Sequence, residues 1–178
     1  MSLQDDYLQT AIKRFRMYEE LGDRAFEQLA DDESFHLEPA EGSNSLAIII
    51  QHMHGNMLSR WTNFLTEDGE KAFRQRDAEF TDQKYTKQQL IDLWKEGWKC
   101  TLDTLQSLKP SDLEKTIEIR GEKLTVVDAI NRQLAHYPYH VGQIVYLTKM
   151  IKGGAWKNLS IERGKSVQYN EAMKKPNR

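Results

Sequence analysis

The sequence has little cysteine and no long hydrophobic run. A single residue, Cys100, cannot form an intramolecular disulfide, so nothing favours an oxidising compartment. The most apolar stretch, residues 141–151, is much shorter than a membrane span and contains Lys149. Residues 1–6 include two aspartates and lack the apolar segment of a signal peptide. These absences predict a cytoplasmic protein that does not enter the membrane.

Charge of neither sign is in large excess. The 25 Lys and Arg residues nearly balance 27 Asp and Glu residues, which gives a formal net charge of -2 at pH 7. Such a balance gives no basis for binding nucleic acid or an anionic membrane surface. A length of 178 residues with 39% hydrophobic content is typical of one globular domain with a real core. We therefore expect residues 1–178 to form a single domain.

Apolar residues that recur at three- and four-residue spacing predict four long amphipathic helices. The expected ranges are about 3–30, 45–66, 86–109 and 126–152. Ser45 can cap the second helix, Thr86 with Gln89 the third, and Thr125 with Asp128 the fourth. The fold class is therefore all-α, a four-helix bundle.

The connections between these helices are long. Residues 66–84 are polar and predict a loop with a short helical turn, whereas residues 116–126 alternate around Gly121 and predict a small β-hairpin or an extended connection. Connections of this length, 66–85 and 109–125, allow crossovers in the bundle. The tail after Gly153-Gly154 is too apolar for a free end, so we expect it to pack on the bundle with a short helix at 163–173. Its apolar residues are Trp156, Leu159, Ile161, Tyr169 and Met173.

Two histidines in the fourth predicted helix form a candidate half of a metal site. His136 and His140 are four residues apart, so they lie on one face with Cβ atoms about 5–6 Å apart. Pro138 lies between them and removes a helix hydrogen bond at a cost of about 3 kcal/mol, which indicates a local geometry kept for a reason. The alternative is a pair of histidines that make ordinary hydrogen bonds at the edge of the core.

A third histidine is available on the second predicted helix. His52 and His54 lie about 200° apart around that helix, so at most one of them can face the centre of the bundle. Gly55, in mid-helix beside them, indicates the close approach of another element. Three imidazoles suit zinc, nickel, iron or cobalt and leave coordination positions for water or a substrate atom. No acidic residue separates His136 from His140, so the pattern is not the H-E-x-x-H of metalloproteases.

Residues 133–144, around the His pair, and residues 45–56, around His52, together resemble the signature of the DinB-like (damage-inducible) superfamily of four-helix metalloenzymes. The resemblance implies one mononuclear metal held by His52, His136 and His140, with His52 preferred to His54 by motif position. The superfamily includes S-transferases that use bacillithiol or mycothiol, and its members are often dimers. The chain is more closely similar to an uncharacterised bacterial subgroup of that superfamily, through Ser59-Arg60-Trp61 among other residues.

Several polar side chains can support such a site. Asn56 and Gln143 lie one turn beyond His52 and His140 and can orient a bound ligand. Arg60 can bind a carboxylate in a cofactor or substrate, as can Arg132. The alternative for both arginines is a salt bridge at the surface or between helices.

The expected function is that of a metal-dependent enzyme with a small-molecule substrate. The cofactors would be a divalent metal (zinc, nickel or iron) and a low-molecular-weight thiol, and the reaction a bacillithiol-type S-transfer in detoxification. A metal-dependent hydrolase needs the same site, and a non-catalytic metal-binding or structural bundle is the third hypothesis. The resemblance also implies a homodimer.

Overall fold

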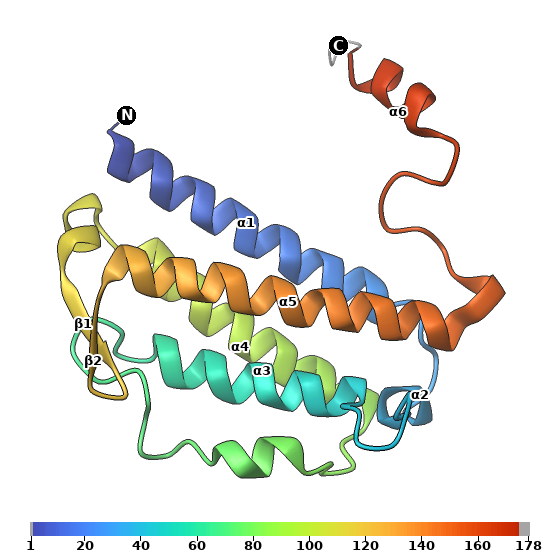
Figure 1. Cartoon of the computed structure of the whole chain (residues 1–178), viewed down its shortest axis with the longest axis horizontal. Helices are drawn as coiled ribbons and strands as arrows, with labels where there is room; N and C mark the ends of the chain where they lie inside the picture. Colours follow the sequence, from blue (N-terminus) through green and yellow to red (C-terminus); the bar gives the residue numbers. More distant parts are fainter. Residues whose placement is uncertain (1, 175–178) are drawn as a thin grey trace.

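The computed structural model describes residues 2–174, and in this part of the chain four long helices lie together as a bundle (Figure 1). They are α1 (Leu3–Phe26), α3 (Leu46–Trp61), α4 (Lys87–Ser107) and α5 (Val126–Lys152). Helix α3 packs mainly on α4, and α1 mainly on α5. The prediction of an all-α four-helix bundle is confirmed. Within residues 2–174 no helix is long and apolar enough to cross a membrane.

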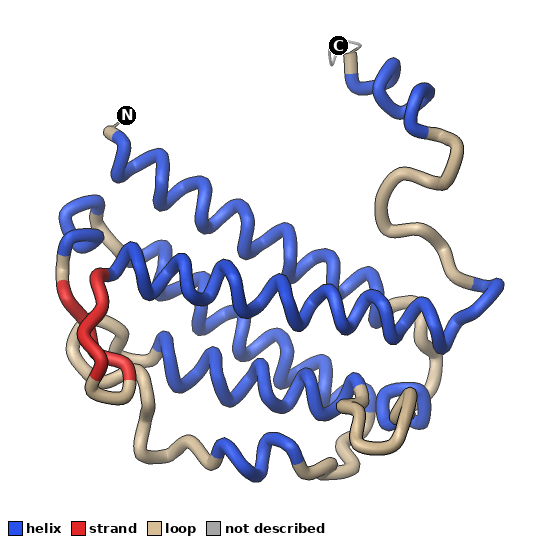
Figure 2. The backbone as a smooth tube through the Cα atoms, in the orientation of Figure 1, coloured by secondary structure: helices blue, strands red, loops and turns tan. Residues whose placement is uncertain are grey.

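The shorter elements lie at the ends and on one side of the bundle. The antiparallel hairpin of β1 and β2, which pairs Ile119 with Glu122 across its turn, lies at one end (Figure 2). Of the two structures predicted for residues 116–126, the β-hairpin is therefore the one that forms. The helical turn expected within 66–84 is η1. The bounds are α2 (Glu33–His36), η1 (Arg76–Phe80), η2 (Pro110–Glu114), β1 (Thr116–Ile119), β2 (Glu122–Thr125), η3 (Gly153–Ala155) and α6 (Ser166–Met173).

The predicted N-caps start three of the helices. The side chains of Ser45, Thr86 and Thr125 accept hydrogen bonds from backbone N–H groups in the first turns of α3, α4 and α5. The predicted ends of two helices were wrong, because α1 stops at Phe26 and α3 at Trp61. Beyond α3 the chain enters the left-handed region at Asn63 (φ 48°), which an α-helix cannot continue through.

Aromatic side chains form the centre of the core and join α3 to α5. The indole Nε1 of Trp61 donates to the hydroxyl of Tyr137 at 2.9 Å, and that hydroxyl donates to Oδ1 of Asn56 at 3.2 Å. Burial raises the pKa of the Tyr137 hydroxyl, which keeps it neutral. Because Tyr137 follows His136 and Asn56 lies one turn after His52, this buried chain of hydrogen bonds fixes the two histidine-bearing segments against each other.

The predicted packing of the C-terminal tail was wrong beyond Leu159. Trp156 and Leu159 are half-buried, but all residues from Ser160 to Lys174 are exposed, α6 included. Gly153 (φ 52°) turns the chain away from the axis of α5, and the tail then leaves the bundle (Figure 1). Gln28 holds its start through two hydrogen bonds to the backbone of Lys157. The buried core consists of residues between Leu8 and Leu147, and the apolar residues of the tail by themselves do not show whether they join it.

Candidate metal centre

His52, His136 and His140 meet between α3 and α5. One ring nitrogen from each lies within 4.8 Å of the other two. The Nε2 atom of His136 is 3.0 Å from Nε2 of His140 and 3.4 Å from Nε2 of His52. The structure therefore brings together His136, His140 and His52, which the family resemblance preferred to His54. Helix α5 runs through Pro138 without a break.

The other two histidines lie elsewhere and have other partners. His54 points to α4, where its Nε2 is 2.9 Å from a carboxylate oxygen of Glu96. His36 contacts Asp82 through Nδ1 and the backbone carbonyl of Tyr85 through Nε2, both at 2.8 Å. The choice of His52 over His54 thus agrees with the geometry.

Each histidine of the cluster has an oxygen acceptor at its second ring nitrogen. The Nδ1 atom faces a carboxylate oxygen of Glu79 in His52 (3.0 Å), and an amide oxygen in the two others: Gln143 for His140 (2.8 Å) and Gln133 for His136 (3.4 Å). These acceptors favour the tautomer that carries its proton on Nδ1, which turns the Nε2 lone pairs into the cluster. Such convergence of lone pairs is repulsive without a cation between them.

Burial keeps two of the three imidazoles neutral. Burial, reinforced by the nearby His140 and His52, lowers the pKa of His136 to about 3. Burial also lowers the pKa of His140 to about 4. A zinc ion with bonds of about 2.0–2.1 Å in tetrahedral geometry requires nitrogen atoms roughly 3.3 Å apart. Two of the three Nε2 separations, 3.0 and 3.4 Å, are close to this spacing, and the third is within 4.8 Å. Neutral imidazoles are the form that binds a metal ion.

Glu79, from η1, is the site residue that sequence reasoning missed. Its buried carboxylate accepts from His52 and also from Arg74, whose Nε and Nη2 donate at 2.7 and 2.8 Å. Burial alone would raise the pKa of Glu79, but the hydrogen bonds from Arg74 and His52 outweigh it and hold the pKa below its ordinary value. The carboxylate is therefore ionised and orients the His52 ring.

Gly55 is the sequence signal that could have pointed to Glu79. A Cβ atom at Gly55 would lie 2.3 Å from Oε1 of Glu79, so only glycine leaves room for this carboxylate. The close approach predicted from Gly55 is confirmed. The approaching residue could not be chosen from the sequence, because the polar segment 66–84 contains several acidic residues.

The three predicted supporting residues have different roles in the structure. Gln143 contacts His140 as described, and its Nε2 donates to the hydroxyl of Tyr139 at 3.2 Å, which fixes the amide orientation. Asn56 faces the cavity but bonds to Tyr137. Arg60 donates from both terminal nitrogens to one carboxylate oxygen of Glu70, at 3.0 and 3.1 Å, so it forms the salt bridge that was its alternative role.

A cavity of about 400 Å³ opens onto the histidine cluster. The residues that line it are mostly polar, and within residues 2–174 they include no Asp or Glu. Five arginines share the lining with the three histidines: Arg60, Arg74, Arg76, Arg120 and Arg132. The cluster is therefore accessible to a small molecule, and the surrounding wall is cationic.

A comparison with protein families matches residues 2–165 to the family described as "Protein of unknown function (DUF1572)". The chain belongs to the DUF1572 family. No curated protein matches it. The description of the DUF1572 family names no activity and no link to the DinB-like superfamily.

Proposed function

We propose that this protein is a metal-dependent enzyme whose mononuclear divalent cation is held by His52, His136 and His140. The observation that carries the proposal is the convergence of three Nε2 atoms, with each ring held by an acceptor at Nδ1. With the proton on each Nδ1, three lone pairs face one another at 3.0 and 3.4 Å, an arrangement that suits a bound cation. The adjoining cavity makes the cluster accessible to a substrate.

A divalent cation held by these three histidines would lower the pKa of a thiol or water bound to it. The chain itself contributes orientation. Glu79 and Gln143 hold the imidazoles of His52 and His140, and buried Tyr137 holds α3 against α5. Zinc, nickel and iron all accept three imidazoles, so the donor set selects a class of metal.

The finer proposal is thiol S-transfer with a low-molecular-weight thiol of the bacillithiol type. Hydrolysis generally uses a side chain that moves protons to and from water, and within residues 2–174 no carboxylate lines the cavity. A thiol needs only to lose its proton, which passes to solvent. Its sulfur then bonds to an electrophilic carbon, and the leaving group departs with the bonding electron pair. The DinB-like resemblance supports the same reaction.

Metal content tests the centre directly. We expect purified, untagged protein to bind about one equivalent of metal, measured by inductively coupled plasma mass spectrometry. His52→Ala and His136→Ala should lose it, whereas His54→Ala should keep it, because His54 contacts Glu96 on another face. Wild-type protein that takes up no zinc, nickel or iron would refute the proposal.

Turnover separates the competing functions. The metal-loaded protein is incubated with an aromatic electrophile, with and without bacillithiol or cysteine. Product that requires both thiol and metal supports S-transfer, and product without thiol supports the hydrolase. If metal removal leaves thiol transfer unchanged, S-transfer by this centre is wrong. If His136→Ala changes only the melting temperature and no reaction is found, the non-catalytic hypothesis holds.

A further inference from the structure

The wall of the cavity beside the histidine cluster carries more positive than negative charge. Its five arginines come from α3, the loop after it, η1, the hairpin turn and α5. The carboxylates within ion-pair distance of them, in the described part of the chain, are Glu70, Glu79 and Glu122. Three carboxylates thus pair with four of the five guanidinium groups, and one of the three also contacts His52.

Two of the arginines have structural partners that occupy them. Arg60 is buried and donates to Glu70 and to the carbonyl of Gly69. Arg74 makes the paired hydrogen bonds to Glu79 described above and a further contact with Glu70. These side chains position Glu79 and the loop after α3, so they are not free to receive a ligand.

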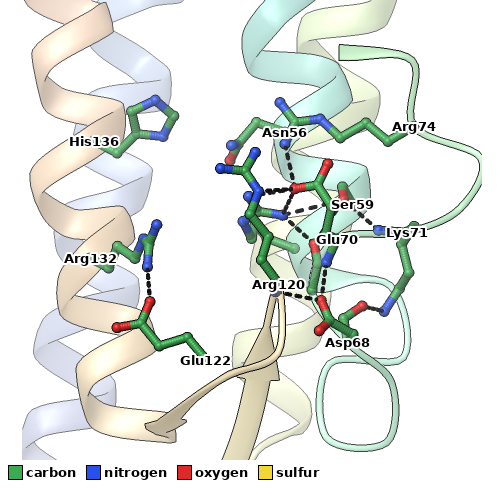
Figure 3. A network of polar contacts seen from close by, with 12 residues as sticks. Asn56, Ser59, Asp68, Glu70, Lys71, Arg74, Arg120, Glu122, Arg132 and His136 are labelled. Atoms are coloured by element: carbon green, nitrogen blue, oxygen red, sulfur yellow. Dashed lines mark hydrogen bonds and ion pairs between the residues drawn. The ribbon is translucent and has the colours of Figure 1, made fainter.

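Arg132 has free donors next to the cluster. It lies on α5 one turn before His136, and Figure 3 shows the two side chains one above the other. Its one partner within residues 2–174 is Glu122, at 3.4 Å. The two side chains are 43% and 64% exposed, so solvent screens this ion pair and it holds the guanidinium weakly.

Arg120 reaches the same cavity from the hairpin turn. It bonds to Glu70 through Nε at 2.9 Å, and its terminal nitrogens have no hydrogen bond to any residue from 2 to 174. Arg120 adopts a left-handed conformation (φ 57°) at a turn position that favours Asn or Gly. The carboxylate of Asp68 holds that turn by accepting from the N–H groups of Arg120 and Gly121, both at 2.8 Å. Figure 3 draws the contact between Asp68 and Arg120.

We propose that the cavity binds an organic anion whose carboxylate or phosphate group is held by Arg132 and Arg120, with its reactive end toward the three Nε2 atoms. This inference rests on the proposed function, since it names the substrate or cofactor class of the same site. The planar guanidinium suits the bidentate recognition of these oxyanions. The cavity volume of about 400 Å³ lies within the roughly 300–1,000 Å³ of small-molecule sites.

Calorimetric titration with simple probes tests the anion subsite. Succinate, inorganic phosphate and neutral succinamide are titrated into metal-free and metal-loaded protein. The proteins are wild type, Arg132→Gln, Arg120→Gln, the double variant and Arg163→Gln. Arg163 is an exposed arginine of the tail, so its variant makes the same charge change outside the cavity. Circular dichroism melts show which variants remain folded. Arg132→Lys is a second variant at residue 132, and it keeps the positive charge but loses the planar guanidinium group.

We expect wild type and Arg163→Gln to bind succinate or phosphate, and the tighter of the two identifies the anionic group. Each cavity variant should weaken that binding by roughly ten- to a hundredfold, and Arg132→Lys should also weaken it. Equal affinity in the folded double variant, or equal binding of succinamide, would overturn the anion subsite. If the protein takes up no metal but the cavity variants lose anion binding, the anion subsite is supported and the metal centre is refuted. If the protein takes up metal but the arginine variants bind the anion as wild type does, the metal centre is supported and the anion subsite is refuted.

Discussion

Replacing Gly55 by alanine should damage the proposed metal centre although residue 55 is not one of its three histidines. The new Cβ would lie 2.3 Å from Oε1 of Glu79 and 2.8 Å from its Cδ. Ordinary contact begins at 3.4 Å, so the carboxylate must retreat by about 1 Å. Because Glu79 is held by Arg74 on one side and His52 on the other, it cannot retreat and keep all three hydrogen bonds.

Two opposing contributions set the stability of Gly55→Ala. Alanine in a helix interior is favoured over glycine by about 1 kcal/mol. Losing one hydrogen bond to a charged group costs about 1.5–3 kcal/mol. The net destabilisation is then about 0.5–2 kcal/mol, which lowers Tm by roughly 1–8 °C in a protein of this size. Metal affinity should fall by roughly ten- to a hundredfold, the usual effect of removing the partner of a metal-bound histidine.

Gly142→Ala is the matched control. Gly142 also lies inside a long helix, between His140 and Gln143, but a Cβ atom there has nothing within 4 Å. It should raise Tm by up to about 4 °C, since it gains helix propensity without a clash. Thermal melts followed by circular dichroism on metal-free protein measure stability, and competition with a chromophoric chelator measures zinc affinity.

Equal melting temperatures and equal zinc affinities of Gly55→Ala and Gly142→Ala would contradict a clash with Glu79. Glu79→Gln tests the contribution of the Glu79 charge without that clash, because it keeps the shape of the side chain and removes its charge. It should weaken zinc binding to a similar extent as Gly55→Ala. If Glu79→Gln bound zinc as tightly as wild type, the carboxylate would not orient His52 in the way described.

Three further predictions concern the buried Tyr137, the hairpin turn held by Asp68, and the oligomeric state. Tyr137→Phe should lower stability by about 1–3 kcal/mol, seen in urea unfolding, because it leaves the buried Nε1 of Trp61 and Oδ1 of Asn56 without a partner; an unchanged midpoint would contradict this. The backbone hydrogen bonds from Glu70 and Gly121 lower the pKa of Asp68, so its contribution to stability is present above pH 3.8 and is lost as the pH falls through the folded pKa. The difference in unfolding free energy between wild type and Asp68→Asn should therefore shrink below pH 3.8. A constant difference would be evidence that the ionised Asp68 carboxylate does not stabilise the hairpin turn. We also expect a homodimer of about 42 kDa, twice the chain mass of 20.8 kDa, by light scattering; a monomeric mass would exclude it.

Local chemistry explains why much of the fold could be predicted. The apolar periodicity of the long helices and the caps at Ser45, Thr86 and Thr125 act over a few residues, so they can be read directly from the chain. The ends of α1 and α3 were predicted too late because the residues beyond them still fit an apolar pattern. The predicted packing of the C-terminal tail was wrong for a different reason. Whether Ile161, Tyr169 and Met173 are buried depends on whether the core has room for them, and a local sequence pattern carries no information about that.

The candidate site divides in the same way. The sequence by itself determined that His136 and His140 share a face, because helix geometry dictates it, and it narrowed the third histidine to one of two. Only the tertiary structure brought His52 to them, turned His54 to Glu96, and placed Glu79 against Gly55. It also gathered five arginines from distant segments around one cavity. Contacts between residues far apart in the chain depend on how α3, α5, η1 and the hairpin pack, and packing is a property of the whole fold.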